Sequence, residues 1–235
     1  MSIKVEQLSS KLVGPTYKVM NTNLSLTSLS ILQFDRLTDD EHVPILYAYR
    51  PQNPSNQTLE QGLQKALSEY REFAGRFGSS DNGERVILLN DEGMRFIEAS
   101  ANCTLDEVIP FKSSTLLSFN PCEEDIEELA LVQLTRFTCG SLILSFSSNH
   151  MVADGSFVSQ FMVSWGQACR GFPIHQLPFH NRNIFPPRDP PKVVYDHESN
   201  EVGKRQINQK DNKPPYLGED VIHHKAHFTP ELIAK

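Results

Sequence analysis

The stretch SLILSFSSNHMVADG, residues 141–155, decides the fold, because it joins an apolar strand to the start of a helix through a polar turn. Strand side chains alternate between two faces of a sheet. One face of this strand therefore carries, in order, Leu142, Leu144, Phe146, Ser148 and His150. His150 falls where the strand gives way to the turn, a place from which a rigid sheet can present a catalytic group.

The segments on either side extend this unit. Ala130 to Phe137 is predicted to pair with Ser141 to Asn149, and Gly140 supplies the turn residue that tolerates positive φ. A helix is predicted from about Ser156 to Arg170, with Gly171 as its stop signal. Its inner face is expected to carry Phe157, Phe161, Ser164, Trp165 and Ala168.

The N-terminal part predicts the same alternation of strands and helices. His42 to Arg50 is typical of a strand, and Thr58 to Phe73 predicts a helix with a capping box formed by Thr58 and Gln61. Arg85 to Leu89 and Met94 to Ala99 are predicted as two short strands joined by the turn sequence at residues 90–93. Together these patterns predict an α/β domain over residues 1–172.

The composition changes after residue 172. Residues 173–220 are rich in proline and polar side chains, which predicts a crossover or linker. Residues 221–235 contain a strand pattern, Val221 to Phe228, and then Thr229-Pro230, a helix start. The helix has barely begun at Lys235, so we expect the sequence to be cut short just as a second structural unit starts.

Composition excludes several classes of partner. Of 235 residues, 39% are hydrophobic, the net charge is −7, and no run of Lys or Arg suggests a nucleic-acid partner. No segment predicts a secretory signal or a membrane span, so we expect a cytoplasmic protein without a membrane partner. The cysteines at 103, 122, 139 and 169 form no C-x-x-C pair, which disfavours a zinc site and a disulfide scaffold.

The motif His150-x-x-x-Asp154-Gly155 is the strongest candidate site. The Asp154 carboxylate, just before a helix, can accept backbone N–H bonds or pair with a distant arginine, and Gly155 lets a ligand or backbone come close. A hydrolase using Ser148 and His150 is disfavoured because no Gly-x-Ser-x-Gly elbow exists and Ser147 points to the opposite face.

Metal and bound-cofactor sites are not predicted. A metal site at His223, His224 and His227 is disfavoured, because no cysteine or carboxylate is paired with them; an ordinary polar strand face is the preferred interpretation. The sequence also has no glycine-rich phosphate loop.

These motifs resemble those of the plant BAHD acyl-CoA-dependent acyltransferases. The resemblance rests on HMVADG (150–155), Phe161, Ser164-Trp165, ACRG (168–171), PFHNR (178–182) and RDPP (188–191), in the family's order. Asn149, where peptide-synthetase condensation domains usually have a second histidine, favours BAHD. The segments LTRFTCGSL (134–142), VILLNDEGMRFIEAS (86–100) and IFPPRDPP (184–191) are most similar to N-hydroxycinnamoyltransferases that act on agmatine, tryptamine or putrescine.

The resemblance implies a chloramphenicol-acetyltransferase-like domain, with a mixed β-sheet flanked by helices and an extended crossover segment after it. It implies transfer of an acyl group, such as hydroxycinnamoyl, from acyl-CoA as co-substrate to a small amine or alcohol in plant secondary metabolism. His150 would be the general base in a channel between two domains, lined in part by residues 34–42, and Asp154 would hold the loop through an arginine.

The family's second motif, Asp-Phe-Gly-Trp-Gly, does not occur in these 235 residues. The alternative is therefore a catalytically incompetent fragment, or a pseudoenzyme that binds acyl-CoA or a partner.

Overall fold

The computed structural model describes residues 3–17, 26–32, 34–109, 116–121 and 126–181, together with residues 190 and 192. The chain divides into two units, Met1–Ile184 and Phe185–Lys235, and nearly all described residues lie in the first. The predicted elements after residue 192, the three histidines at 223–227 included, lie outside the described residues. The domain boundaries therefore stay predictions. None of the described helices is long and apolar enough to cross a lipid bilayer.

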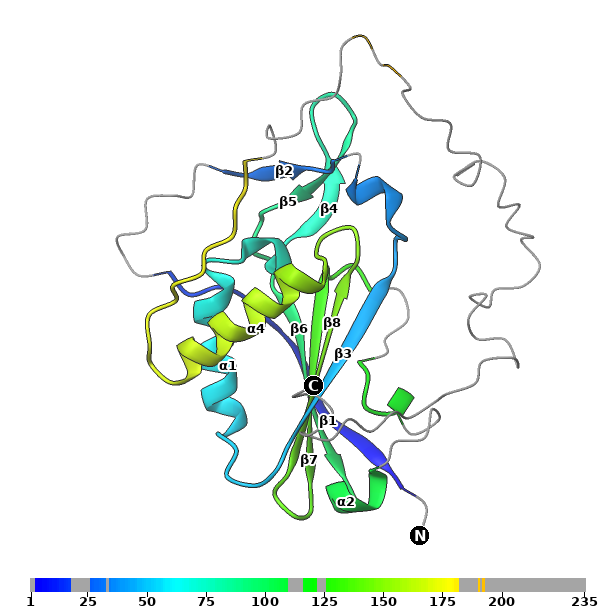
Figure 1. The fold of residues 1–235 in the computed structure, drawn as a ribbon, viewed down its shortest axis with the longest axis vertical. Coiled ribbons are helices and arrows are strands. Elements are labelled where there is room, and N and C mark those ends of the chain that lie inside the picture. The colour runs from blue at the N-terminus through cyan, green and yellow to red at the C-terminus, as the bar shows by residue number, and fades with distance from the viewer. Residues whose placement is uncertain are drawn as a thin grey trace, which may run out of the picture. The chain divides into compact units, whose positions relative to one another are not determined.

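A five-stranded sheet forms the centre of the first unit (Figure 1). Its strands, in spatial order, are β1 (Val5–Val13), β6 (Met94–Ala101), β7 (Ala130–Phe137), β8 (Leu142–Asn149) and β3 (His42–Tyr49). β6 and β7 run parallel, whereas the other neighbouring strands are antiparallel. The predicted mixed sheet is confirmed. β8 lies between two partners, and all of its residues are buried.

The β7–β8 hairpin forms as predicted. Gly140 has a φ of 79° at its turn, a conformation that glycine adopts without a steric penalty. Leu142, Leu144 and Phe146 enter one core, and Ile143 enters another that includes the short helix α2 (Leu105–Val108). Both faces of β8 are thus covered, which makes the strand a firm support for the turn that follows it.

Two helices, α1 (Asn56–Leu67) and α4 (Gly155–Cys169), pack against each other and against the large sheet (Figure 1). Trp165 of α4 is 2% exposed, and its Nε1 donates a hydrogen bond to the Leu59 carbonyl of α1 at 2.8 Å. The helices approach closely at Gly62, where an added Cβ would lie 2.3 Å from Cys169 Sγ. The predicted stop of α4 is confirmed, because Gly171 has a φ of 75°.

The predicted helix from Thr58 to Phe73 is wrong at both ends. Ser55 is the N-cap, since its hydroxyl accepts a hydrogen bond from the Thr58 N–H at 3.1 Å. α1 ends at Leu67, and a separate 3₁₀ helix, η2 (Arg71–Ala74), follows. Tyr70 and Phe73 are nevertheless fully buried, because both continue to face the core through the change of helix type.

The two strands predicted on either side of residues 90–93 belong to different sheets. β5 (Arg85–Leu88) joins β2 (Ser28–Ser30) and β4 (Arg76–Ser79) in a small antiparallel sheet, whereas β6 joins the large one. Arg71 holds Asp91 in an ion pair at 3.0 Å, and the Gly93 N–H donates to the Ala74 carbonyl. Through these contacts, the segment that connects β5 of one sheet to β6 of the other packs against η2.

Candidate active site

His150 lies in the turn that follows β8, beside the edge strand β3. Its backbone N–H donates to the Glu41 carbonyl at 2.9 Å, just past the last pair of the β3–β8 ladder, His42 with Asn149. The ring is half-buried, and its Nδ1 is sealed from solvent without a hydrogen-bond partner among the described residues. A neutral imidazole has one nitrogen that can accept a proton, and because Nδ1 is buried, a molecule outside the packed protein could give a proton only to Nε2.

Asn149 holds the turn that presents His150. Its side chain is buried, with Oδ1 accepting from the Met151 N–H at 3.0 Å and Nδ2 donating to Asp40 at 2.8 Å. Asp40 in turn forms an ion pair with Arg85 at 2.6 Å. The hydrogen bond from Arg85 holds the pKa of Asp40 below its ordinary value, so this carboxylate stays charged. A chain of polar contacts therefore connects the small sheet to the His150 turn.

Asp154 begins α4. Its backbone is extended, with φ −90° and ψ 176°, and its Oδ1 accepts the Phe157 N–H at 2.8 Å. This is an N-cap, which satisfies one of the free N–H groups at a helix start. Within the described residues no arginine pairs with Asp154. A Cβ on Gly155 would meet nothing within 4 Å, so the described protein leaves this place open.

A cavity of about 340 Å³ adjoins the His150 ring. Its lining residues come from the loop around the 3₁₀ helix η1 (Asp35–Leu37), from η2, and from the turn leading into α4. Phe179, in the irregular segment after α4, also lines it. The residues lining the cavity are Phe34, Asp35, Thr38, Glu72, His150, Met151, Val152, Ala153, Asp154, Phe157 and Phe179. Part of the stretch 34–42, expected to line a channel, is thus at this cavity.

The cavity lining is acidic. Asp35, Glu72 and Asp154 contribute three carboxylates, and none of the described lining residues is Lys or Arg. Glu72 is the most buried of the three, 2% exposed, and its Oε1 pairs with His180 Nε2. Its second oxygen, Oε2, is buried and has no hydrogen-bond partner among the described residues.

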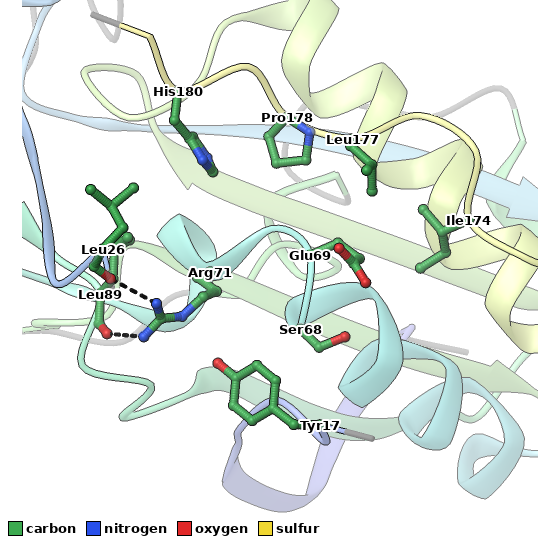
Figure 2. A pocket seen from close by; sticks show the side chains of 10 residues that line it. All are labelled: Tyr17, Leu26, Ser68, Glu69, Arg71, Leu89, Ile174, Leu177, Pro178 and His180. Carbon is green, nitrogen blue, oxygen red and sulfur yellow. Dashed lines mark hydrogen bonds between the residues drawn. The ribbon is translucent and has the colours of Figure 1, made fainter. Parts of the chain in front are cut away.

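His180 also lines a second, larger cavity of about 460 Å³ (Figure 2). Ile174, Leu177 and Pro178 accompany it from the segment after α4, opposite Ser68, Glu69 and Arg71 (Figure 2). The Arg71 guanidinium is fully engaged there, donating to the Leu26 and Leu89 carbonyls and to Asp91. Burial, with the hydrogen bond to Asp91, raises the pKa of Tyr17 to about 12. The Arg71 guanidinium in this second cavity is therefore already hydrogen-bonded, and His150 does not line the cavity.

The serine-hydrolase alternative finds no support in this geometry. Ser147 and Ser148 are buried, and neither lines the cavity beside His150. Among the residues that the structure describes, no three His, Cys, Asp or Glu side chains gather to hold a metal ion.

The sequence did not predict the structural roles of two residues of this site, Asn149 and Glu72. Asn149 was noted only for what it replaces in other families, although the polar turn around it was a signal for side-chain-to-backbone bonding. Glu72 was hidden inside a predicted helix, and its partner His180 lies 108 positions further on. No local sequence pattern could have predicted that these two side chains are in contact.

Comparison with known sequences gives the family. The Transferase family profile matches residues 3–230. Agmatine hydroxycinnamoyltransferase 1 of Oryza sativa subsp. japonica is 42% identical, over 99% of this chain and 55% of that protein. Putrescine hydroxycinnamoyltransferase 3 of the same organism is 40% identical, over 99% of this chain and 54% of that protein. The chain thus spans about half the length of the curated relatives it matches.

Solved structures agree in fold. Vinorine synthase is 25% identical with a TM-score of 0.66, over 82% of this chain and 50% of that one. F. graminearum TRI101, crystallised with coenzyme A and T-2 mycotoxin, is 16% identical with a TM-score of 0.55, over 72% of this chain and 46% of that one, a likeness of fold alone. With the family profile covering nearly the whole chain and relatives at 40% identity or more, the chain belongs to the Transferase family of BAHD acyltransferases.

Proposed function

We propose that this protein transfers an acyl group, such as hydroxycinnamoyl, from a CoA thioester to a small amine or alcohol, with His150 as general base. The observation that carries the proposal is a half-buried histidine at the end of β8 whose ring lines a cavity of about 340 Å³. The names of the relatives favour a hydroxycinnamoyl donor and an amine acceptor. Acyl-CoA as a diffusible co-substrate and a cytoplasmic location belong to the same proposal.

The reaction needs one base that changes roles. The acceptor nitrogen attacks the thioester carbonyl through its lone pair, a C–N bond forms, and the carbonyl becomes a tetrahedral oxyanion. His150 takes the proton that the nitrogen must lose. When the oxyanion collapses, the C–S bond breaks, and the imidazolium protonates the leaving thiolate, giving an amide and free CoA. A positioned base of this kind contributes about 10²–10⁴-fold in rate.

The other motif residues position this base. Asn149 fixes the turn through its two side-chain hydrogen bonds, and Asp154 caps α4 immediately after it. Gly155 leaves space beside the helix start. In the proposal these three act on the orientation of the His150 loop and do not take part in bond making.

The alternative is a protein that binds acyl-CoA or a partner without turnover. Release of free thiol from p-coumaroyl-CoA in the presence of agmatine measures turnover, and calorimetric titration with the same thioester measures binding. The two assays on this chain separate the two functions, because binding without thiol release is the result that the alternative predicts.

His150→Ala is the variant that tests the base. We expect thiol release to fall by about 10²–10⁴-fold, while the binding of p-coumaroyl-CoA stays within a few-fold. His175→Ala is the matched control, since His175 is exposed and does not line the His150 cavity. Near wild-type turnover in His150→Ala would remove this residue from the mechanism.

A further inference from the structure

The turn that carries His150 is tied to the loop before β3 at two neighbouring residues. The Asn149 side chain donates to Asp40 Oδ1 at 2.8 Å, and the backbone N–H of His150 donates to the Glu41 carbonyl at 2.9 Å. Two bonds between adjacent pairs of residues restrain both the rotation and the displacement of the turn, because a single bond would leave a pivot. The first of these bonds requires a hydrogen-bond acceptor at position 40.

Arg85 of the small sheet holds Asp40 from the other side. Its Nη1 donates to Asp40 Oδ2 at 2.6 Å, and its guanidinium lies over the Phe77 ring of β4, 3.8 Å from the ring centre. The same Nη1 lies 3.7 Å from Met151 Sδ, so Arg85 also contacts the residue that follows His150. The Asp40 carboxylate therefore has one oxygen engaged by the His150 turn and the other by the small sheet.

This arrangement is better suited to fixing the turn than to stabilising the whole fold. The side chains of Arg85 and Asp40 are 43% and 49% exposed, and an ion pair so open to water contributes little to global stability. Asn149, by contrast, is 4% exposed, and its Nδ2 finds its acceptor in Asp40. A buried donor that loses its acceptor is costly, so the Asp40 carboxylate matters most at the turn.

We propose that Asp40, held by Arg85, is a positioning residue that sets the orientation of His150 through Asn149. The inference rests on the proposed acyl transfer and adds a residue outside the motif on which the placement of its base depends. Asp40 does not line the His150 cavity, so it acts on the base and does not contact the substrate. Its loss should slow proton transfer and leave substrate binding nearly unchanged, because a displacement of about 1 Å can cost about 10²-fold in rate.

Amide hydrogen exchange, followed by NMR on the whole chain, measures the hold on the turn without any turnover. The Met151 N–H donates to Asn149 Oδ1 at 3.0 Å, so its exchange reports whether the Asn149 side chain is still fixed. In Asp40→Ala we expect the amides of His150 and Met151 to exchange roughly 2- to 10-fold faster, the effect of one lost hydrogen bond on local opening. The Thr58 N–H, bonded to the N-cap side chain of α1, is the internal reference and should not change.

Thiol release from p-coumaroyl-CoA with agmatine adds the catalytic readout. Asp40→Ala should lower kcat by about 10- to 100-fold and leave both KM values within a few-fold. Asp106→Ala is the matched control, because Asp106 of α2 forms an exposed ion pair with Arg50 at 3.0 Å and does not line the His150 cavity. It should change neither kcat nor the exchange of the turn amides.

A charge swap, Asp40→Arg combined with Arg85→Asp, separates positioning from plain ion pairing. It restores opposite charges across the same gap but places a donor where Asn149 Nδ2 needs an acceptor. Turning the Asn149 amide over would not help, because Oδ1 would then leave the Met151 N–H. We therefore expect the swapped variant to exchange its Met151 amide as fast as Asp40→Ala does. Asp40→Asn, whose amide oxygen can still accept from Asn149, should retain most of the protection.

Several outcomes would overturn the proposal. They are unchanged exchange of the His150 and Met151 amides in Asp40→Ala, full recovery in the swapped variant, a rise in exchange that extends equally to Thr58, and a raised KM with unchanged kcat. Should Asp40→Ala fail to fold, as judged by Trp165 fluorescence, Arg85→Gln removes only the outer contact and should give smaller changes of the same kind. If the wild-type chain releases no thiol, the proposed acyl transfer is contradicted, while amide exchange still decides whether Asp40 holds the turn.

Discussion

Removing the carboxylate of Asp154 tests how the fold holds the His150 turn. Asp154→Ala deletes the oxygen that accepts the Phe157 N–H at 2.8 Å. Loss of an N-cap costs about 0.5–2 kcal/mol, and loss of a negative charge at a helix start costs about 0.3–1 kcal/mol more. We expect the free energy of unfolding to fall by about 1–3 kcal/mol, which corresponds to a decrease in Tm of about 2–12 °C for a unit of this size.

Asp154→Asn is the matched variant, because asparagine is as good an N-cap as aspartate but has no charge. It should lose only the charge effect, about 0.3–1 kcal/mol. Urea unfolding followed by tryptophan fluorescence reports on the relevant helix, since the chain has one tryptophan and Trp165 is buried between α4 and α1.

Two results would refute the capping role. If Asp154→Ala unfolded at the wild-type urea concentration, the hydrogen bond to Phe157 would contribute nothing measurable. If Asp154→Asn were as unstable as Asp154→Ala, the charge would matter and the cap would not. That second result would favour the arginine partner that the family resemblance implies.

Two further predictions concern the support around the site. Gly62→Ala should destabilise the protein by about 1–2 kcal/mol, because the added Cβ would lie 2.3 Å from Cys169 Sγ and this overpacking outweighs the gain of about 1 kcal/mol in helix propensity. Urea unfolding should show a smaller loss of stability in the double variant with Cys169→Ala. An increase in the stability of Gly62→Ala would contradict the close contact. Burial lowers the pKa of His42 below its ordinary value of 6.5, so its contribution to stability is present above pH 6.5 and is lost as the pH falls towards the folded-state pKa. His42→Gln should therefore show a smaller decrease in Tm between pH 7.5 and 5.5 than the wild type. An identical decrease in the two proteins would exclude His42 as a cause.

The motif strand and its neighbours were predictable because the signals in them are local. Alternation along residues 142–150 follows from the two-residue repeat of a strand, and glycines 140 and 171 mark places where the backbone needs positive φ. The end of the first helix was not predictable in the same way. Apolar spacing up to Phe73 fits one long helix or a helix followed by a 3₁₀ turn, and the difference depends on contacts made elsewhere in the chain.

The sheet assignment shows the same limit. Residues 85–88 and 94–101 are separated by a turn sequence, and a turn sequence states only that the chain reverses or bends. The second strand enters the large sheet because its backbone pairs with β1 and β7, whereas the first strand pairs with β2 and β4. The segment between them contacts η2 through the Arg71–Asp91 ion pair and the hydrogen bond from Gly93 to Ala74, and the sequence pattern had merged η2 into a longer helix.

Taken alone, the 235 residues were sufficient for the family, the central hairpin and the histidine at the end of its second strand, because these depend on residues a few positions apart. Only the folded chain could bring Glu72 to His180 and both to the neighbourhood of the His150 cavity. The physical reason is that burial is a property of the whole packed molecule. A carboxylate looks like any other in a sequence until tertiary contacts remove its water and leave one oxygen without a donor.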